Sequence, residues 1–171
     1  MRLSQRLLGG FLFIILVLVA LVVTSVDRRV RERLLEQAGA GLLREARLVA
    51  LTSVADSSAD SLANELGRTL GHRVTLIAAD GTVLGDSEFD GAPLRQLENH
   101  GTRPEVISAI AHDTGTAVRR SASAGDVEVY AAVRDAGGVA RVSMSFAIQS
   151  LVESQLRRDI FTAAAFAALA A

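Results

Sequence analysis

The chain has 171 residues, of which 50% are hydrophobic and 22% are charged, and its net charge is -1. This length suits one small domain with membrane segments, and the charge gives no basic surplus that would favour nucleic acid. Because there is no cysteine, disulfide bonds, thiolate catalysis and cysteine-based zinc sites are excluded.

Two uncharged stretches lie near the ends of the sequence, at residues 7–26 and 160–171. The first is long enough as a helix, at about 30 Å, to cross the hydrocarbon core of a bilayer. We expect an uncleaved transmembrane helix there, with residues 1–6 on the cytoplasmic side, as Arg2 and Arg6 indicate. The alternative is a cleaved signal peptide, but no small-residue cleavage site follows. Residues 160–171 are expected to begin a second transmembrane helix that the given sequence truncates.

Residues 27–71 are predicted to form a long helical segment, because apolar side chains recur at helical spacing. Gly39 and Gly41 are candidates for a bend in it, and Asp60 or Ser61 is a candidate cap for a second helix. Residues 150–159 are predicted to be a helical connector into the second span.

Between these helical parts, residues 72–149 show the alternation of strands. Strands are predicted at 73–78 and 82–85, joined by an Asp80-Gly81 hairpin turn. An irregular stretch and a short helix at 104–111 follow, and then come three more strands: a candidate at 117–123 and two clearer ones that alternate around 127–134 and 141–148. The predicted fold class is α+β, with a five-stranded antiparallel sheet whose apolar face is covered by the long N-terminal helix.

Two motifs in this region follow one another in a fixed order. Asp86-Ser87-Glu88 comes after the hairpin, and Glu98-Asn99-His100 with Arg103-Pro104-Glu105-Val106 comes later. The combination resembles the extracytoplasmic PAS-like (single Cache-type) sensor regions of bacterial sensor histidine kinases of the phosphate-regulon type.

The resemblance implies a location in the bacterial inner membrane with the sensor domain outside the cytoplasm. It also implies a parent chain that continues into a dimerisation helix with a phosphoacceptor histidine and an ATP-binding kinase core, with ATP and magnesium as cofactors. The implied partners are a second copy of the chain, the lipid bilayer, a cytoplasmic response regulator and an extracytoplasmic ligand or protein.

Six polar residues are candidate ligand contacts, four of them in one loop and two on predicted strands. The alternative for the loop residues is structural, since Asn and His satisfy backbone groups and Arg103 can pair with Glu98 or Glu105. Arg119 and Arg120 are adjacent on a strand and point to opposite faces, so at most one of them enters a pocket. The candidates are Glu98, Asn99, His100, Arg103, Arg119 and Tyr130.

Other patterns are weaker. Asp86 and Glu88 could bind a cation, although a surface turn, which needs no such role, is the favoured interpretation. The stretch from His100 to Pro104 does not match a phosphoacceptor motif, because Gly101 replaces the acid that should follow the histidine. We expect no catalytic residue and no metal site in this segment. The leading hypothesis is the sensory input region of a histidine kinase; the alternatives are the input region of a chemoreceptor or diguanylate cyclase, and a non-signalling membrane-anchored binding module.

Overall fold

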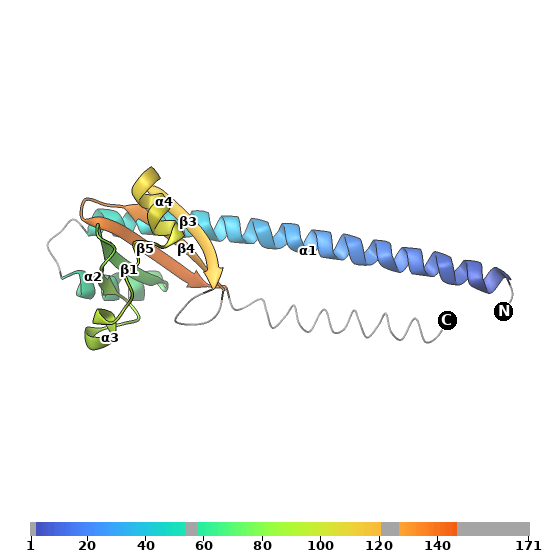
Figure 1. The fold of residues 1–171 in the computed structure, drawn as a ribbon, viewed down its shortest axis with the longest axis horizontal. Helices are drawn as coiled ribbons and strands as arrows, with labels where there is room; N and C mark the ends of the chain where they lie inside the picture. Colours follow the sequence, from blue (N-terminus) through green and yellow to red (C-terminus); the bar gives the residue numbers. More distant parts are fainter. Residues whose placement is uncertain (1–2, 54–57, 121–126, 147–171) are drawn as a thin grey trace. The chain divides into compact units, whose positions relative to one another are not determined.

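The computed structural model describes residues 3–53, 58–120 and 127–146, which form an α+β fold (Figure 1). The predicted connector at 150–159 and the second span at 160–171 lie outside these residues. In chain order the elements are α1 (Leu3–Thr52), α2 (Ala59–Leu70), β1 (Arg73–Ala78), β2 (Val83–Asp86), α3 (Gly91–Arg95), α4 (Pro104–His112), β3 (Thr114–Arg120), β4 (Val127–Arg134) and β5 (Gly138–Ser145).

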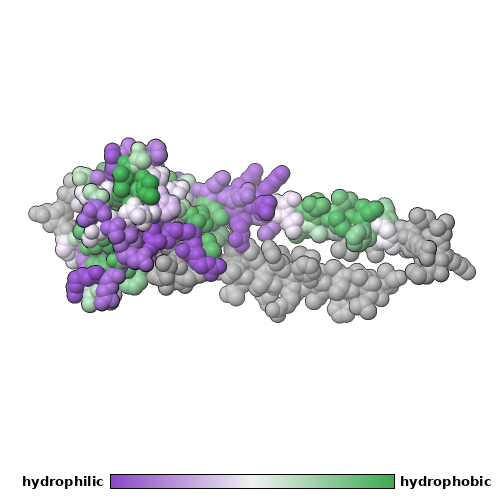
Figure 2. All heavy atoms as spheres, viewed as in Figure 1, coloured by the Kyte–Doolittle hydropathy of each residue, from purple (hydrophilic) through white to green (hydrophobic). Residues whose placement is uncertain are grey.

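The N-terminal part of α1 is apolar and belongs to a compact unit separate from Leu35–Ala147. Within α1, an 18-residue window has a mean hydropathy of 2.8 and none of it is buried. Figure 2 shows this stretch as a hydrophobic band along the helix, followed by a hydrophilic section. This part of α1 is long enough and apolar enough to cross a membrane, which the predicted transmembrane helix requires.

The five strands form one antiparallel sheet in the order β2-β1-β5-β4-β3. The predicted fold class is confirmed, including the number of strands and their antiparallel pairing. The last strand in the chain, β5, lies in the centre between β1 and β4. Strand β3 stands at one edge and β2 at the other.

The first face of the sheet is covered by the C-terminal part of α1 and by α2. Alternate residues of β1, β4 and β5 enter this core, which follows the predicted period of two. Val129, Ala131 and Val133 of β4 lie here, as the sequence pattern predicted. The fully buried side chains that α1 contributes are Leu42, Ala46 and Val49.

The second face of the sheet is covered by α4. Val106 and Ala109 of α4 pack against Ile77, Ala132 and Val139 of the strands in a small apolar core. Helix α4 approaches β3 closely at Gly115, where an added Cβ would lie 2.1 Å from the Glu105 carbonyl oxygen. The absence of a side chain at Gly115 therefore sets how near α4 comes to the sheet.

Several local details differ from the sequence pattern. Helix α1 continues through Gly39 and Gly41 without interruption. Helix α2 is capped by Ser58, whose hydroxyl oxygen accepts from the Ser61 amide at 3.4 Å, and not by Asp60 or Ser61. Strand β3 begins at Thr114, earlier than the expected 117, and the short helix α3 lies within the stretch predicted to be irregular.

The Asp80-Gly81 turn is confirmed, and it holds the loop that carries the candidate ligand residues. Gly81 has a φ of 86°, which is in the left-handed region that favours glycine. Its carbonyl oxygen accepts from the His100 amide at 2.8 Å, so the hairpin and the loop are joined through backbone.

Candidate functional site

The second face of the sheet carries buried charged and polar side chains beside the small core under α4. An antiparallel sheet commonly leaves one face in water, but here this face is covered. Charged groups are rarely buried unless they are paired. We call the following residues the polar cluster: Arg73, Thr75, Asp86, Glu105, Arg119, Tyr130 and Arg141.

One half of the polar cluster joins β1 to the edge strand β2. Arg73 donates from Nε to both oxygens of Asp86, at 3.0 and 3.1 Å, and from Nη2 to Oδ2 at 2.9 Å. The Thr75 hydroxyl donates to the same Oδ2 at 2.8 Å. Asp86 is 0% exposed, so this carboxylate is held between the two strands by charge-assisted bonds.

The other half joins α4 to β3 and β5. Glu105, on the first turn of α4, accepts from Arg119 Nη2 at 3.0 Å and lies 3.5 Å from Arg141 Nη1. Arg141 also donates to the Thr75 hydroxyl at 3.0 Å. Thr75 and Arg141 are direct cross-strand partners, which places the threonine between the two halves. The cluster is therefore one connected network from β2 to β3.

The Tyr130 ring forms part of the floor of this network. The Arg119 guanidinium carbon lies 3.8 Å from the ring centroid, and that of Arg141 lies 5.3 Å from it. Stacking of a guanidinium on an aromatic face is favourable and keeps the group's hydrogen-bond donors free at its edge. Tyr130 thus helps to fix both arginines in position.

The electrostatics of the cluster follow from burial and pairing. Burial lowers the pKa of Arg141 to about 10, although the negative charge of Glu105 works in the opposite direction. For Glu105, burial alone would raise the pKa, but the bond from Arg119 and the nearby guanidinium charges outweigh it, and the pKa lies below its ordinary value. Both groups are charged at neutral pH, so the cluster holds paired ions.

Several buried polar atoms of this face have no hydrogen-bond partner among the described residues. Three belong to the polar cluster: Glu105 Oε2, Arg119 Nε and Arg141 Nε. A buried polar atom without a partner is unfavourable by about 1–3 kcal/mol. These three atoms are unused hydrogen-bonding capacity on the covered face, and polar groups of this kind are what a ligand site would use.

The structure brings two of the six predicted site residues, Arg119 and Tyr130, directly into the cluster. Arg119 points to the covered face while Arg120 is exposed on the other, as the alternation predicted. His100 is 6% exposed, and its pKa is lowered to about 4 by burial and by the positive charges of Arg141, Arg103 and Arg73. It is therefore a neutral imidazole near this face.

The other three predicted residues lie in the loop and make local contacts. Asn99 donates to the Asp80 carbonyl oxygen at 2.9 Å and accepts from the Gly101 amide at 2.8 Å, so it ties the loop to the hairpin. Arg103 pairs with Glu98 at 2.9 Å, and Glu98 is 77% exposed. These contacts match the structural alternative that the sequence left open for the loop.

Sequence reasoning did not include Arg73, Thr75, Glu105 or Arg141 among the site residues. For the strand residues, the signal that could have found them is the period of two, since polar side chains alternate with apolar ones on adjacent strands, as at Tyr130, Arg141 and Ser143. Glu105 lies on α4 and has no such signal. The sequence predicts Asp86 in a surface turn, with cation binding as the alternative. Its carboxylate is instead committed to Arg73 and Thr75.

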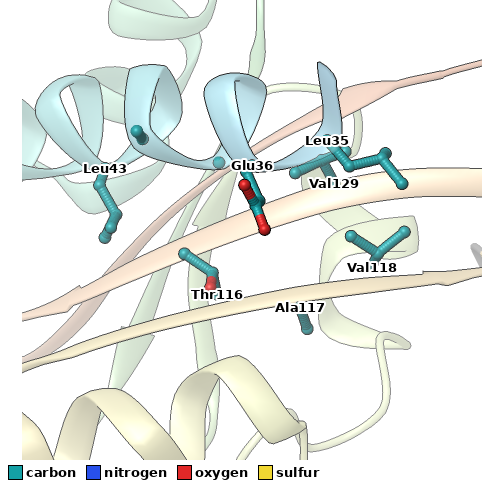
Figure 3. Close-up of a pocket in the computed structure, with 9 residues that line it drawn as sticks. Leu35, Glu36, Leu43, Thr116, Ala117, Val118 and Val129 are labelled. Atoms are coloured by element: carbon teal, nitrogen blue, oxygen red, sulfur yellow. The ribbon is translucent and has the colours of Figure 1, made fainter. Parts of the chain in front are cut away.

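A groove with a volume of about 400 Å³ lies on the first face, between α1 and the strands β3 and β4 (Figure 3). Most of the labelled side chains that line it are apolar, and Glu36 is the charged one: Leu35, Glu36, Leu43, Val118 and Val129. It is open and mostly apolar, and it has no converging set of buried polar groups. For this reason, the polar cluster is the stronger candidate for a ligand site.

In residues 3–53, 58–120 and 127–146, no three His, Cys, Asp or Glu side chains converge as a metal site would require. Glu88, the second acid of the possible cation pair, lies 3.2 Å from Arg73 Nη1, which places a positive charge beside it.

Comparison with solved structures shows the fold. The Bacillus subtilis YkuI protein, which has an EAL domain and was solved with c-di-GMP and calcium, aligns with a TM-score of 0.53 over 85% of this chain, at 13% identity. The V. cholerae histidine kinase DctB sensor domain aligns with a TM-score of 0.47 at 19% identity, and covers 61% of this chain. The ligand-binding domain of the Pseudomonas aeruginosa PAO1 amino-acid chemoreceptor PctC, solved with GABA, gives 0.45 at 21% identity and also covers 61%.

This chain spans only part of each of these proteins: 39% of the YkuI chain, 43% of the DctB chain and 54% of the PctC chain. At these identities the likeness concerns the fold. No protein-family model matches the sequence, and no curated protein matches it significantly.

Proposed function

We propose that this chain is the sensory input and transmembrane signalling region of a two-component sensor histidine kinase. In this proposal, the sheet domain lies outside the cytoplasm and receives a stimulus, and the helices carry the response across the inner membrane to a kinase core. The phosphate-regulon type of sensor is the specific form that the resemblance of the two sequence motifs favours. We place ATP and magnesium in that core and assign none of their ligands to the described residues.

The observation that carries the proposal is the extent of α1. This one helix contains the apolar window of 18 residues and also the residues that pack on the sheet, Leu42, Ala46 and Val49. Helices are stiff and packed interfaces have discrete arrangements. A change in how the sheet holds α1 would therefore be passed along the helix to its membrane segment.

The polar cluster supplies a place where a stimulus could act. Its ions link β1, β2, β3, β5 and α4, and Glu105, Arg119 and Arg141 keep unpaired polar atoms. A ligand shifts a conformational equilibrium only by its difference in affinity for the two states. A polar molecule that competes with Glu105 for these arginines would favour a state in which α4 is separated from the sheet over the state in which α4 is docked.

Two other classes of protein would use the same layout. A chemoreceptor would continue into a long heptad coiled coil, and a diguanylate cyclase would continue into a G-G-[DE]-E-F motif. A non-signalling membrane-anchored binding module would carry neither. The apolar window and the connected polar cluster fit each of these, and the two motifs around Asp86 and Glu105 favour the kinase.

Two experiments test the proposal. The first is to read the coding sequence that continues past Ala171; an H-E-x-x-x-P helix and ATP-binding motifs are expected, and their absence removes the kinase assignment. The second measures ATP-dependent autophosphorylation of the parent protein in membrane vesicles. Arg119→Gln should change this activity, whereas Arg120→Gln, on the opposite face of the same strand, should leave it near the wild-type level.

The orientation needs its own test, and the absence of cysteine makes one available. A single cysteine at the exposed position Asp113 should react with a membrane-impermeant maleimide in intact cells. A cysteine at Ser4, on the expected cytoplasmic side, should react only after the membrane is opened. The reverse pattern would place the sheet domain in the cytoplasm.

A further inference from the structure

A short basic stretch of α1 follows the apolar segment almost directly. Residues 28–33 contain four arginines and one acid, Glu32, although the whole chain has a net charge of -1. All four arginines are exposed, and Figure 2 shows the hydrophilic section of the helix that comes after the hydrophobic band. We call these four residues the arginine collar: Arg28, Arg29, Arg31 and Arg33.

Three members of the arginine collar have no partner within the part of the chain that the structure describes. Glu32 lies four residues after Arg28 and three after Arg29, which are spacings at which ion pairs form along a helix. No ion pair or hydrogen bond of the described side chains joins them, and none reaches Arg33. The guanidinium groups of Arg28, Arg29 and Arg33 are therefore available to an anion from outside these residues.

One face of α1 connects the arginine collar to the apolar segment. An open groove with a volume of about 310 Å³ runs along this face. Its lining residues follow one another at the three- and four-residue steps of a single helix side: Leu18, Leu21, Val22, Ser25, Val26 and Arg29. The Ser25 hydroxyl donates to the Leu21 carbonyl oxygen at 2.7 Å, so it is already satisfied within the helix. The groove is thus apolar along its length and positively charged at one end.

We propose that the arginine collar and this groove bind an anionic phospholipid, in the leaflet next to the sheet domain. The headgroup phosphate lies at the arginines and an acyl chain lies along the groove. This proposal rests on the membrane segment of the proposed function, and it needs neither the kinase assignment nor a particular orientation in the membrane.

The dimensions and the chemistry agree with a lipid. At 1.5 Å per residue, Arg28 and Arg33 are about 7.5 Å apart along the helix axis. The headgroup layer on each side of a bilayer is about 5–7 Å thick, so the arginine collar fits within it. Guanidinium groups bind phosphate oxygens through paired, charge-assisted hydrogen bonds. An anionic lipid supplies this phosphate together with a net negative charge and an apolar chain, which are the two properties that the face of α1 combines.

The test is quenching of a single tryptophan, because the chain contains none. Val23→Trp, at a 42% exposed position that does not line the groove, reports on the lipid near the end of the apolar segment. The chain is placed in vesicles of equal parts phosphatidylcholine and phosphatidylglycerol, with bromine on the acyl chains of one lipid or of the other. Brominated phosphatidylglycerol should quench at least about twofold more strongly, because basic residues at the surface enrich anionic lipid.

Variants of the arginine collar identify the cause of this preference. Arg28→Gln, Arg29→Gln and Arg33→Gln together should make the two lipids quench equally, whereas lysine at the same three positions should keep the preference, since the charge remains. Arg44→Gln with Arg47→Gln is the matched control, because these exposed arginines follow Arg33 by eleven and fourteen residues on the same helix. The control should leave the preference unchanged. Salt at about 1 M, where charges are screened within about 3 Å, should bring the ratio close to one.

Equal quenching by the two lipids in the Val23→Trp chain, or a preference that survives the three glutamine substitutions, would overturn the proposal. Loss of the preference when inorganic phosphate replaces chloride at constant ionic strength would also overturn it, since the arginines would then bind a soluble anion. Both leaflets of these vesicles have the same composition, so the result does not depend on orientation. Failure here would leave the kinase motifs after Ala171 and the labelling at Asp113 as expected, whereas failure of the proposed function would appear in those two observations.

Discussion

Glu105 on α4 and Arg119 on the edge strand β3 meet across the second face of the sheet, with the Arg119 Nη2 atom 3.0 Å from Glu105 Oε1. The carboxylate is 0% exposed and also lies 3.5 Å from Arg141. Glu105 thus links the short helix α4 to two arginines on different strands, Arg119 on β3 and Arg141 on β5. The contact makes the docking of α4 depend on charge as well as on apolar packing.

Glu105→Gln should therefore destabilise the domain strongly. Removing one partner of a buried ion pair leaves the other charge uncompensated and typically lowers the free energy of unfolding by about 3–5 kcal/mol. Urea unfolding of the chain in detergent micelles measures this. Glu98→Gln is the matched control, because Glu98 pairs with Arg103 at a similar distance, 2.9 Å, but from a 77% exposed position. The loss there should be below about 1 kcal/mol. Equal losses in the two variants would contradict the role given to Glu105.

Asp86→Asn should act at the other end of the polar cluster. The substitution keeps the shape of the side chain but removes the charge that Arg73 contacts at three short distances. We expect a loss of about 3 kcal/mol in the free energy of unfolding. Glu88→Gln is the control, since Glu88 contacts the same arginine from a 54% exposed position. A neutral effect of Asp86→Asn would show that the β1–β2 hairpin does not need this ion pair.

Gly115→Ala should separate α4 from the sheet without changing any charge. An added Cβ would meet the Glu105 carbonyl oxygen at 2.1 Å and the Ser108 Cβ at 2.8 Å, so the helix must shift. Overpacking of this kind lowers the free energy of unfolding by about 1–3 kcal/mol. Gly137→Ala has its nearest neighbour at 3.7 Å and should have little effect. Crystal structures or amide hydrogen exchange of α4 would reveal the shift directly.

Stability should also fall on acidification because of His100, whose pKa is lowered to about 4 by burial and by nearby arginines. The unfolded chain takes up this proton near pH 6.5, and the folded chain only near pH 4. Between these values the unfolded state binds more protons, so the free energy of unfolding decreases as the pH falls. The total decrease is roughly 3 kcal/mol, since one pKa unit corresponds to about 1.4 kcal/mol.

Unfolding measured between pH 7 and pH 4 checks this dependence. His100→Gln should flatten the slope between pH 6.5 and 4, while His112→Gln, at an exposed position, should preserve it. The lowered pKa of Glu105 acts in the same direction, since its stabilising charge is present above the ordinary carboxyl range and is lost as the pH falls through the folded value. An unchanged slope in His100→Gln would show that its protonation is not coupled to folding.

The sequence predicted the elements of this fold well and its site only in part. Period two in β4 placed Val129 and Ala131 in the core, and the Asp80-Gly81 turn was confirmed, because both depend on local chemistry. The polar cluster depends on sheet order, which brings Thr75 beside Arg141 although 65 other residues separate them in the chain. Alternation alone predicts which face of the sheet carries Arg141, but it does not predict that helix α4 covers this face.

The loop residues illustrate the same limit. Asn99 and His100 stood out because their side chains often carry chemistry, yet Asn99 is used to hold the loop on the hairpin. Glu105 lies in the motif that resembles a sensor domain, and the sequence pattern offers it only as a possible partner for Arg103. Its pairing with Arg119 required knowledge of how α4 lies on β3.

The central place of β5 has a consequence for how the protein is made. The two hairpins, β1–β2 and β3–β4, are joined only when β5 is laid between them, with Arg73 opposite Ser143 and Ser145 opposite Glu128. Until residue 145 has left the ribosome, the sheet lacks its central strand and the earlier strands cannot complete it. Biogenesis must therefore keep two unfinished halves apart and free of aggregation until the last strand arrives.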